Sequence, residues 1–191
     1  SRTVTKDIEA PEASALLRTT MRQNLIVRSV ALLDVRGQVL ASSSHAGARL
    51  PLRLPDGFVA QVLAPAVSTL EVSPLALSFV STEQVLYFGR YFRLADGEQL
   101  LAVAEVPSSA LVSVLMQGVD IAGLQVLLER DNGSVLLRVP DGAEPLGVRP
   151  ALVLPALQAT QPLFQPQLTL LASMPLASAL VQWQDERRAL L

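Results

Sequence analysis

The sequence has no cysteine and one histidine, His45, and these absences restrict the chemistry open to the chain. A chain without thiols has no cysteine nucleophile, and a single imidazole cannot build a Cys/His zinc site. Positive charge is sparse and dispersed, with a formal net charge of −2 and Lys6 as the sole lysine. Because contacts with a nucleic-acid backbone need clustered Lys and Arg, we expect no nucleic-acid partner.

Charge of either sign is scarce beside apolar residues: 17% of the 191 residues are charged and 50% are hydrophobic. Disordered chains show the opposite balance, so we expect one large or two small globular domains with a real core. Proline and glutamine interrupt the uncharged stretch 150–184, so we do not expect it to cross a membrane. The final helical pattern has no stop signal, which indicates a piece of a longer protein.

The spacing of apolar residues predicts helices and strands in a mixed order. Apolar residues from Ala13 to Leu25 recur every three or four positions and predict a helix. Two runs on either side of Gly37 predict a hairpin, in which the glycine supplies a positive φ. The remaining predicted elements of the first part are a short helix at 58–64 and strands at 75–80, 85–94 and 99–106. A short amphipathic helix follows, with the apolar residues Leu111, Val112, Leu115 and Met116 and with Gly118 as its C-cap.

A short motif is repeated 96 residues further along the chain. The stretch Leu33–Leu40 resembles Glu129–Leu136, and both combine a polar turn and a glycine, Gly37 or Gly133, with an apolar strand. We therefore predict two modules, with strands in the second at 124–130, 135–139 and 167–172. A final helix from Pro175 carries an apolar seam, formed by Leu176, Leu180, Trp183 and Leu190.

The candidate catalytic residues all have simpler interpretations. His45 follows three serines, but neighbouring strand residues point to opposite faces, and the sequence has no G-x-S-x-G motif. A solvated loop histidine is therefore the preferred interpretation. Asp34, Asp96 and Asp131 lie close to glycines, which is ordinary turn chemistry. We accordingly predict no catalytic residue, no metal ligand and no cofactor in this chain.

Half of the eight aromatic residues gather around Arg90. On a strand, Phe88, Arg90 and Phe92 share one face, whereas Tyr87, Tyr91 and Arg93 share the other. An arginine among aromatic rings can bind a carboxylate in a half-apolar pocket, which makes Arg90, Tyr87 and Tyr91 the predicted ligand-binding residues. We expect such a pocket in the first module, with the irregular segment 45–73 as its cover. The alternative is a core face and a surface face without a pocket.

Three stretches resemble the double Cache family of PAS-like sensor domains. Ser29–Ser43 is similar to the first hairpin of that family, and Arg90–Ala104 to its central strand pair. Leu127–Pro140 resembles the opening of the second module, in which a leucine-rich run, Arg-Asp-x-Gly and Arg-x-Pro follow one another. The resemblance implies an α+β fold of two antiparallel sheets with flanking helices, the second module abbreviated. Its implied divisions are an N-terminal helical segment 1–28, a membrane-distal module 29–117, a membrane-proximal module 118–174 and a C-terminal helix 175–191.

The same resemblance implies a periplasmic sensor domain of a bacterial inner-membrane signalling protein, whose output is a diguanylate cyclase, phosphodiesterase or kinase. The Tyr/Arg/Trp/Asp pattern of the amino-acid-binding members is absent, so no ligand residues carry over. We expect an unknown small-molecule ligand, no enzymatic activity in this chain, and a monomer or a weak homodimer formed by the terminal helices. The alternative is a dimerisation or protein-interaction module of a membrane receptor that binds no small molecule.

Overall fold

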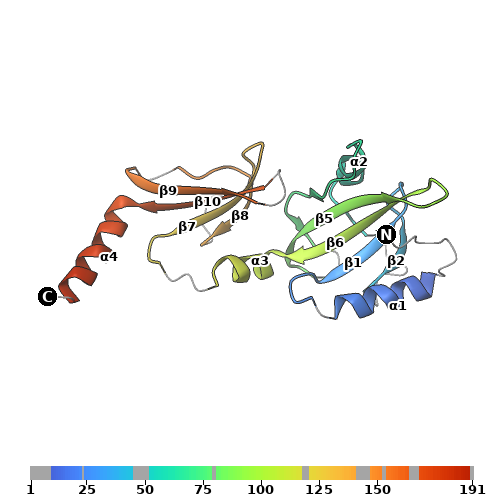
Figure 1. Cartoon of the computed structure of the whole chain (residues 1–191), viewed down its shortest axis with the longest axis horizontal. Coiled ribbons are helices and arrows are strands. Elements are labelled where there is room, and N and C mark those ends of the chain that lie inside the picture. Colours follow the sequence, from blue (N-terminus) through green and yellow to red (C-terminus); the bar gives the residue numbers. More distant parts are fainter. Residues whose placement is uncertain are drawn as a thin grey trace. The chain divides into compact units, whose positions relative to one another are not determined.

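A computed structural model of the chain (Figure 1) describes residues 10–22, 24–44, 52–78, 81–117, 121–140, 147–151, 154–163 and 168–189. Within these ranges the side chains of Ala10, 182–186 and 188–189 are not described. The chain divides into two compact units, Ser1–Ser113 and Val114–Leu191. His45 and the side chain of Trp183 lie outside the described part, so the predictions about them stay predictions.

The first unit contains an antiparallel sheet flanked by helices, as predicted. Its strands run in the order β2-β1-β6-β5-β3, and β4 also pairs with β5. Figure 1 shows α1 along β1 and β2, and α2 next to β5. The elements are α1 (Ala10–Met21), β1 (Ser29–Leu33), β2 (Val39–Ser42), α2 (Phe58–Leu63), β3 (Glu71–Val72), β4 (Ala76–Leu77), β5 (Gln84–Arg93), β6 (Gln99–Pro107) and α3 (Ser108–Leu115).

The core of the first unit forms on one face of this sheet. Alternate residues of β1, β5 and β6 point to that face, where they pack against Phe58 and Val62 of α2. Gly89 lets α2 approach β5 closely, because a Cβ atom at this position would lie 2.6 Å from Cγ2 of Val62 and 3.0 Å from Cζ of Phe58. The buried residues of the cluster are Ala31, Leu33, Phe58, Val62, Val85, Tyr87, Tyr91, Leu101 and Val103.

The second unit is built on a smaller antiparallel sheet, with strands in the order β8-β7-β10-β9. Leu127, Val135 and Leu171 form its buried apolar cluster. Its elements are β7 (Gln125–Arg130), β8 (Val135–Val139), β9 (Ala156–Pro162), β10 (Leu168–Pro175) and α4 (Leu176–Ala189). No helix in the described part of the chain is long and apolar enough to cross a membrane.

The repeated motif forms the same turn in both units. Gly37 and Gly133 have φ of 80° and 78°, and their amides donate to the carbonyl oxygens of Asp34 and Arg130 respectively. The prediction that these glycines occupy equivalent hairpin turns is therefore confirmed. Gly97, between β5 and β6, makes the same turn with φ of 88°. The turn alone is thus characteristic of a hairpin rather than of a repeat.

Two predicted boundaries were wrong for local reasons. The helix predicted from Ala13 to Leu25 ends at Met21, and Leu25 is 97% exposed. The side chain of Asn24 accepts hydrogen bonds from the amides of Ile26 and Val27, an alternative to helical bonding that ends the helix. The strand predicted over 75–80 is confined, within the described residues, to β4 at Ala76–Leu77.

Strand β9 was not predicted. It carries proline and glutamine at an exposed sheet edge, where a strand needs no continuous apolar face.

Candidate functional site

Two of the three predicted ligand residues belong to the core of the first unit. Tyr87 is fully buried among the residues beneath α2. Tyr91 is 5% exposed, and its hydroxyl lies 3.0 Å from the carbonyl oxygens of both Pro65 and Ala66. The segment after α2 therefore covers the sheet, as expected of a lid, but the space beneath α2 is filled by the protein's own side chains.

Arg90 points to the opposite face of the sheet. Its side chain is exposed, and its Nε donates to Oγ of Ser68 at 3.3 Å. There it borders an open, almost wholly apolar groove, lined further by Ile26, Val27, Val30, Leu70, Phe88, Ala102, Ala104, Val106 and Leu111. The structure therefore does not bring Arg90 together with Tyr87 and Tyr91, because strand alternation separates them. A ligand-binding role for these residues stays a prediction.

A buried polar cluster lies beside Tyr87. Glu105, directly opposite on β6, is 2% exposed, and its Oε1 accepts a hydrogen bond from Oγ of Ser78 at 3.0 Å. Nη1 of Arg28 lies 3.6 Å from the same carboxylate oxygen, while Nη2 pairs with Glu83. Oε2 of Glu105 and the hydroxyl of Tyr87 are both buried without a well-oriented hydrogen bond to a described residue. Burial, reinforced by the charge of Glu105, raises the pKa of Tyr87 far above its ordinary value.

In the second unit, residues 147–151 are attached to the sheet by an ion pair and by hydrogen bonds, including one of 3.5 Å from Nη2 of Arg138 to the carbonyl oxygen of Val148. Glu129 of β7 is 3% exposed, and its Oε1 accepts a hydrogen bond from Nε of Arg149 at 2.8 Å while Oε2 pairs with Nη2. Hydrogen bonding to Glu129, with its charge, raises the pKa of Arg149. The amide of Gly147 also donates to the carbonyl oxygen of Val135. These contacts hold the segment against the side of the sheet that carries Glu129.

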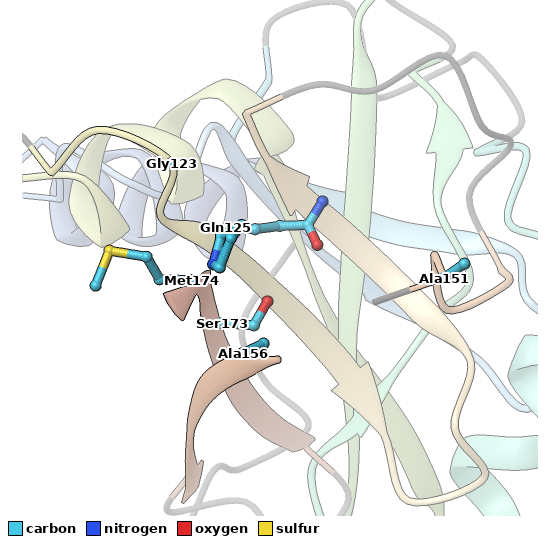
Figure 2. Close-up of a pocket in the computed structure, with 7 residues that line it drawn as sticks. Gly123, Gln125, Ala151, Ala156, Ser173 and Met174 are labelled. Atoms are coloured by element: carbon cyan, nitrogen blue, oxygen red, sulfur yellow. The ribbon is translucent and has the colours of Figure 1, made fainter. Parts of the chain in front are cut away.

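A half-open cavity of about 180 Å³ lies between this sheet and Ala151. Gln125 of β7 and Ser173 of β10 are directly opposite each other, so their side chains share one face. Figure 2 shows the Gln125 side chain extending toward Ala151, with the Ser173 hydroxyl beside it and Met174 pointing the other way. The lining residues are Gly123, Gln125, Ala151, Ala156, Ser173, Met174 and Pro175.

The cavity was missed by the sequence interpretation, although a signal was present. Gln125 and Ser173 occupy core-facing positions of strands whose next core-facing residues, Leu127 and Leu171, are apolar. A polar residue in such a position needs a partner or access to solvent. That signal becomes useful only when the pairing of β7 with β10 is known.

The described residues offer no cluster of side chains for metal binding, and two of the aspartates have roles in turns. The described part of the chain contains no group of three His, Asp or Glu side chains that could hold a metal ion. Asp34 and Asp96 accept hydrogen bonds from the backbone amides two residues further along, which confirms their interpretation as turn residues.

No known family model matches the sequence, and no curated protein sequence matches it. Solved structures of sensor domains do match the fold. The extracellular domain of rpHK1S-Z16, a protein assigned as a histidine kinase, shares 20% identity with a TM-score of 0.67, over 89% of this chain and 79% of that domain. The ligand-binding domain of the Pseudomonas aeruginosa chemoreceptor PctC, in complex with GABA, shares 20% identity with a TM-score of 0.58, over 90% and 81%.

The ligand-binding domain of the Pseudomonas fluorescens chemoreceptor CtaA, in complex with L-isoleucine, is similar in the same way. It shares 14% identity with a TM-score of 0.62, over 91% of this chain and 78% of that domain. The chain thus has the fold of extracellular sensor domains of histidine kinases and chemoreceptors, which confirms the fold predicted from the Cache resemblance.

Proposed function

We propose that this chain is the ligand-sensing domain of a bacterial membrane signal transducer, located in the periplasm and anchored in the inner membrane. The observation that carries the proposal is the match along about nine-tenths of the chain to sensor domains, two of which hold small ligands. The matching domains are sensor domains rather than catalytic domains, which supports a sensing function. Output through a diguanylate cyclase, a phosphodiesterase or a kinase domain follows from the same Cache resemblance.

A thermal-shift screen of the isolated domain against small metabolites tests this function. A ligand at one hundred times its Kd stabilises the folded state by about 2.7 kcal/mol, which raises the Tm of a chain of this size by about 5–10 °C. A saturable rise with one chemical class of metabolite is the expected result. A flat response to all classes would contradict ligand sensing.

The apolar groove beside Arg90 favours a second candidate function, dimerisation through this face of the first unit. Its lining is almost wholly apolar and lies open, and a second copy of the chain would remove that surface from water. Sedimentation of Ala104→Arg tests this candidate, because Ala104 lines the groove. The variant should shift any concentration-dependent dimer to monomer, whereas Leu77→Arg, at an exposed position outside the groove, should not.

A further inference from the structure

We propose that the cavity of the second unit binds a small, uncharged, polar molecule through Gln125 and Ser173. This inference rests on the proposed sensing function and deepens it, because it assigns a site and a ligand class. It also places the site in the second unit rather than beside Arg90, Tyr87 and Tyr91, where the sequence predicted a pocket.

Two polar side chains face the cavity without partners in the described part of the chain. Ser173 is 5% exposed, and no hydrogen bond joins its hydroxyl to another described residue. The side-chain amide of Gln125 likewise makes no hydrogen bond to a described residue, and Figure 2 shows this side chain extending into the same space. The Ser173 hydroxyl is open to the cavity rather than enclosed by protein, so a molecule bound there can hydrogen-bond to it in place of water. Together the two groups offer both donors and acceptors.

The size of the cavity limits the ligand. An engineered protein cavity of about 150 Å³ accommodates benzene, which has six non-hydrogen atoms. The cavity here, at about 180 Å³, suits a molecule of about the same size. The other described residues of the wall are small or apolar, namely Gly123, Ala151, Ala156, Met174 and Pro175.

The lining also determines the charge of the ligand. None of the described residues that line the cavity is charged, and a desolvated carboxylate or ammonium group without an opposite charge is strongly unfavourable. GABA and L-isoleucine, the ligands of the PctC and CtaA domains, each carry both groups. This cavity therefore favours a neutral amide or alcohol over an amino acid.

The cavity adjoins the first turn of α4. Gly123, with φ of 80°, approaches that turn so closely that a Cβ atom there would lie 2.9 Å from Oγ of Ser178. The amide of Leu176, the first residue of α4, donates to the carbonyl oxygen of Pro155. Pro175 lines the cavity and directly precedes the helix. A ligand in the cavity thus contacts the walls that hold the start of α4, which gives binding a route to the C-terminal helix.

An NMR titration of the isolated domain tests the site and the ligand class together. Three probes of equal size are compared: isobutyramide, its charged counterpart isobutyrate, and L-alanine. We expect isobutyramide alone to produce saturable shifts, at the side chains of Gln125 and Ser173 and at the amides of Gly123 and Ser178. So small a ligand with two polar contacts should have a Kd of about 1–10 mM.

Matched variants identify the contacts. Gln125→Met removes the amide while keeping the side-chain length, and Ser173→Ala removes only the hydroxyl. Each should weaken isobutyramide binding by about tenfold, the equivalent of one hydrogen bond. Gln161→Met is the control, since Gln161 lies opposite Leu170 on the other face of the sheet and is not among the described residues that line the cavity. It should leave the Kd unchanged.

Several results would overturn the inference. The first is that isobutyramide produces no saturable shift at Gln125 and Ser173 up to about 50 mM. The second is that isobutyrate or L-alanine binds as tightly as isobutyramide, and the third is that Gln125→Met keeps full affinity. The metabolite screen separates this failure from a failure of the proposed function. A metabolite that stabilises the domain while shifting only first-unit resonances would overturn the cavity as the site and leave ligand sensing intact. If no metabolite or probe binds, both are wrong.

Discussion

The sheets of the two units are similar in topology, but their core-facing surfaces differ. In the first unit, α2 packs so closely on β5 that Gly89 has no room for a Cβ atom, and Tyr87 fills the space beneath. In the second unit, residues 147–151 are held by the Arg149–Glu129 pair, and a cavity remains beside Gln125 and Ser173.

This difference shows how one type of fold can serve two roles. A sheet face packed with large side chains contributes stability, because burial of apolar surface is the main favourable contribution to folding. A face that leaves a cavity beside polar side chains loses part of that stability and gains space for a ligand. This difference is the basis for proposing the ligand site in the second unit and a structural role for the core face of the first.

Opening the first unit should cause the largest loss of stability. Phe58 is 1% exposed and belongs to the cluster beneath α2, so Phe58→Ala removes a ring from the core and leaves a cavity. We expect a loss of about 3–5 kcal/mol in the free energy of unfolding, measured by urea denaturation. Val67→Ala, at a position 77% exposed, should cost less than about 0.5 kcal/mol. A loss below about 1 kcal/mol for Phe58→Ala would contradict a tightly packed first unit.

Filling the contact between β5 and α2 should have a smaller effect. The added methyl group of Gly89→Ala would meet Val62 and Phe58 at distances that require one of them to move. We expect a loss of about 1–3 kcal/mol by urea denaturation, since this is the usual cost of overpacking. Combining it with Val62→Ala should cost less than the sum of the two single changes. Simple additivity would show that α2 does not press on β5 at this point.

Features set by local sequence were predicted well. The hairpins around Gly37 and Gly133 depend on a glycine with positive φ between polar turn residues, and both signals lie within a few positions. The two faces of β5 followed directly from alternation. Helix α1 was extended too far because the competing hydrogen bonds of Asn24 depend on how the chain turns after Met21.

Features set by pairing between distant strands could not be read from the sequence. The candidate site exists because Gln125 and Ser173 face each other across two strands far apart in the chain, and only the register brings them together. Arg90 and the tyrosines were grouped because they are close in sequence, yet they lie on opposite sides of the sheet. Which face of the sheet carries the core depends on where α2 packs, and the position of α2 is set by contacts with distant parts of the chain.

Releasing the segment that borders the second cavity should cost less than either change in the first unit. Arg149→Met leaves the buried carboxylate of Glu129 without its ion-pair partner, but Arg149 is 52% exposed and water already screens the pair. We expect a loss of about 1 kcal/mol and faster hydrogen exchange at the amide of Gly147. Arg36→Met, which changes an exposed arginine of the first unit, should alter neither quantity. Unchanged exchange in Arg149→Met would mean that other contacts hold the segment.

At neutral pH, Tyr87→Phe should change the free energy of unfolding least of all these variants. At alkaline pH its stability should differ from that of the wild-type chain. The hydroxyl of Tyr87 makes no well-oriented hydrogen bond to a described residue, so its removal should change stability by less than about 0.5 kcal/mol at pH 7. In the folded chain the pKa of Tyr87 is raised by burial and by Glu105, whereas in the unfolded chain it returns to about 10. Above pH 10 the unfolded state therefore releases a proton that the folded state keeps, and stability falls as the pH rises.

Urea denaturation between pH 8 and 11 measures this slope. The wild-type chain should lose stability above about pH 10, and Tyr87→Phe should lose less, because the buried phenol that opposes ionisation is absent. Tyr91→Phe serves as the matched control, since its hydroxyl is hydrogen-bonded to backbone carbonyl groups and its loss should cost about 1 kcal/mol at neutral pH. A Tyr87→Phe variant as sensitive to alkali as the wild type would show that the first unit admits water to this tyrosine, and the contrast with the second unit would then be lost.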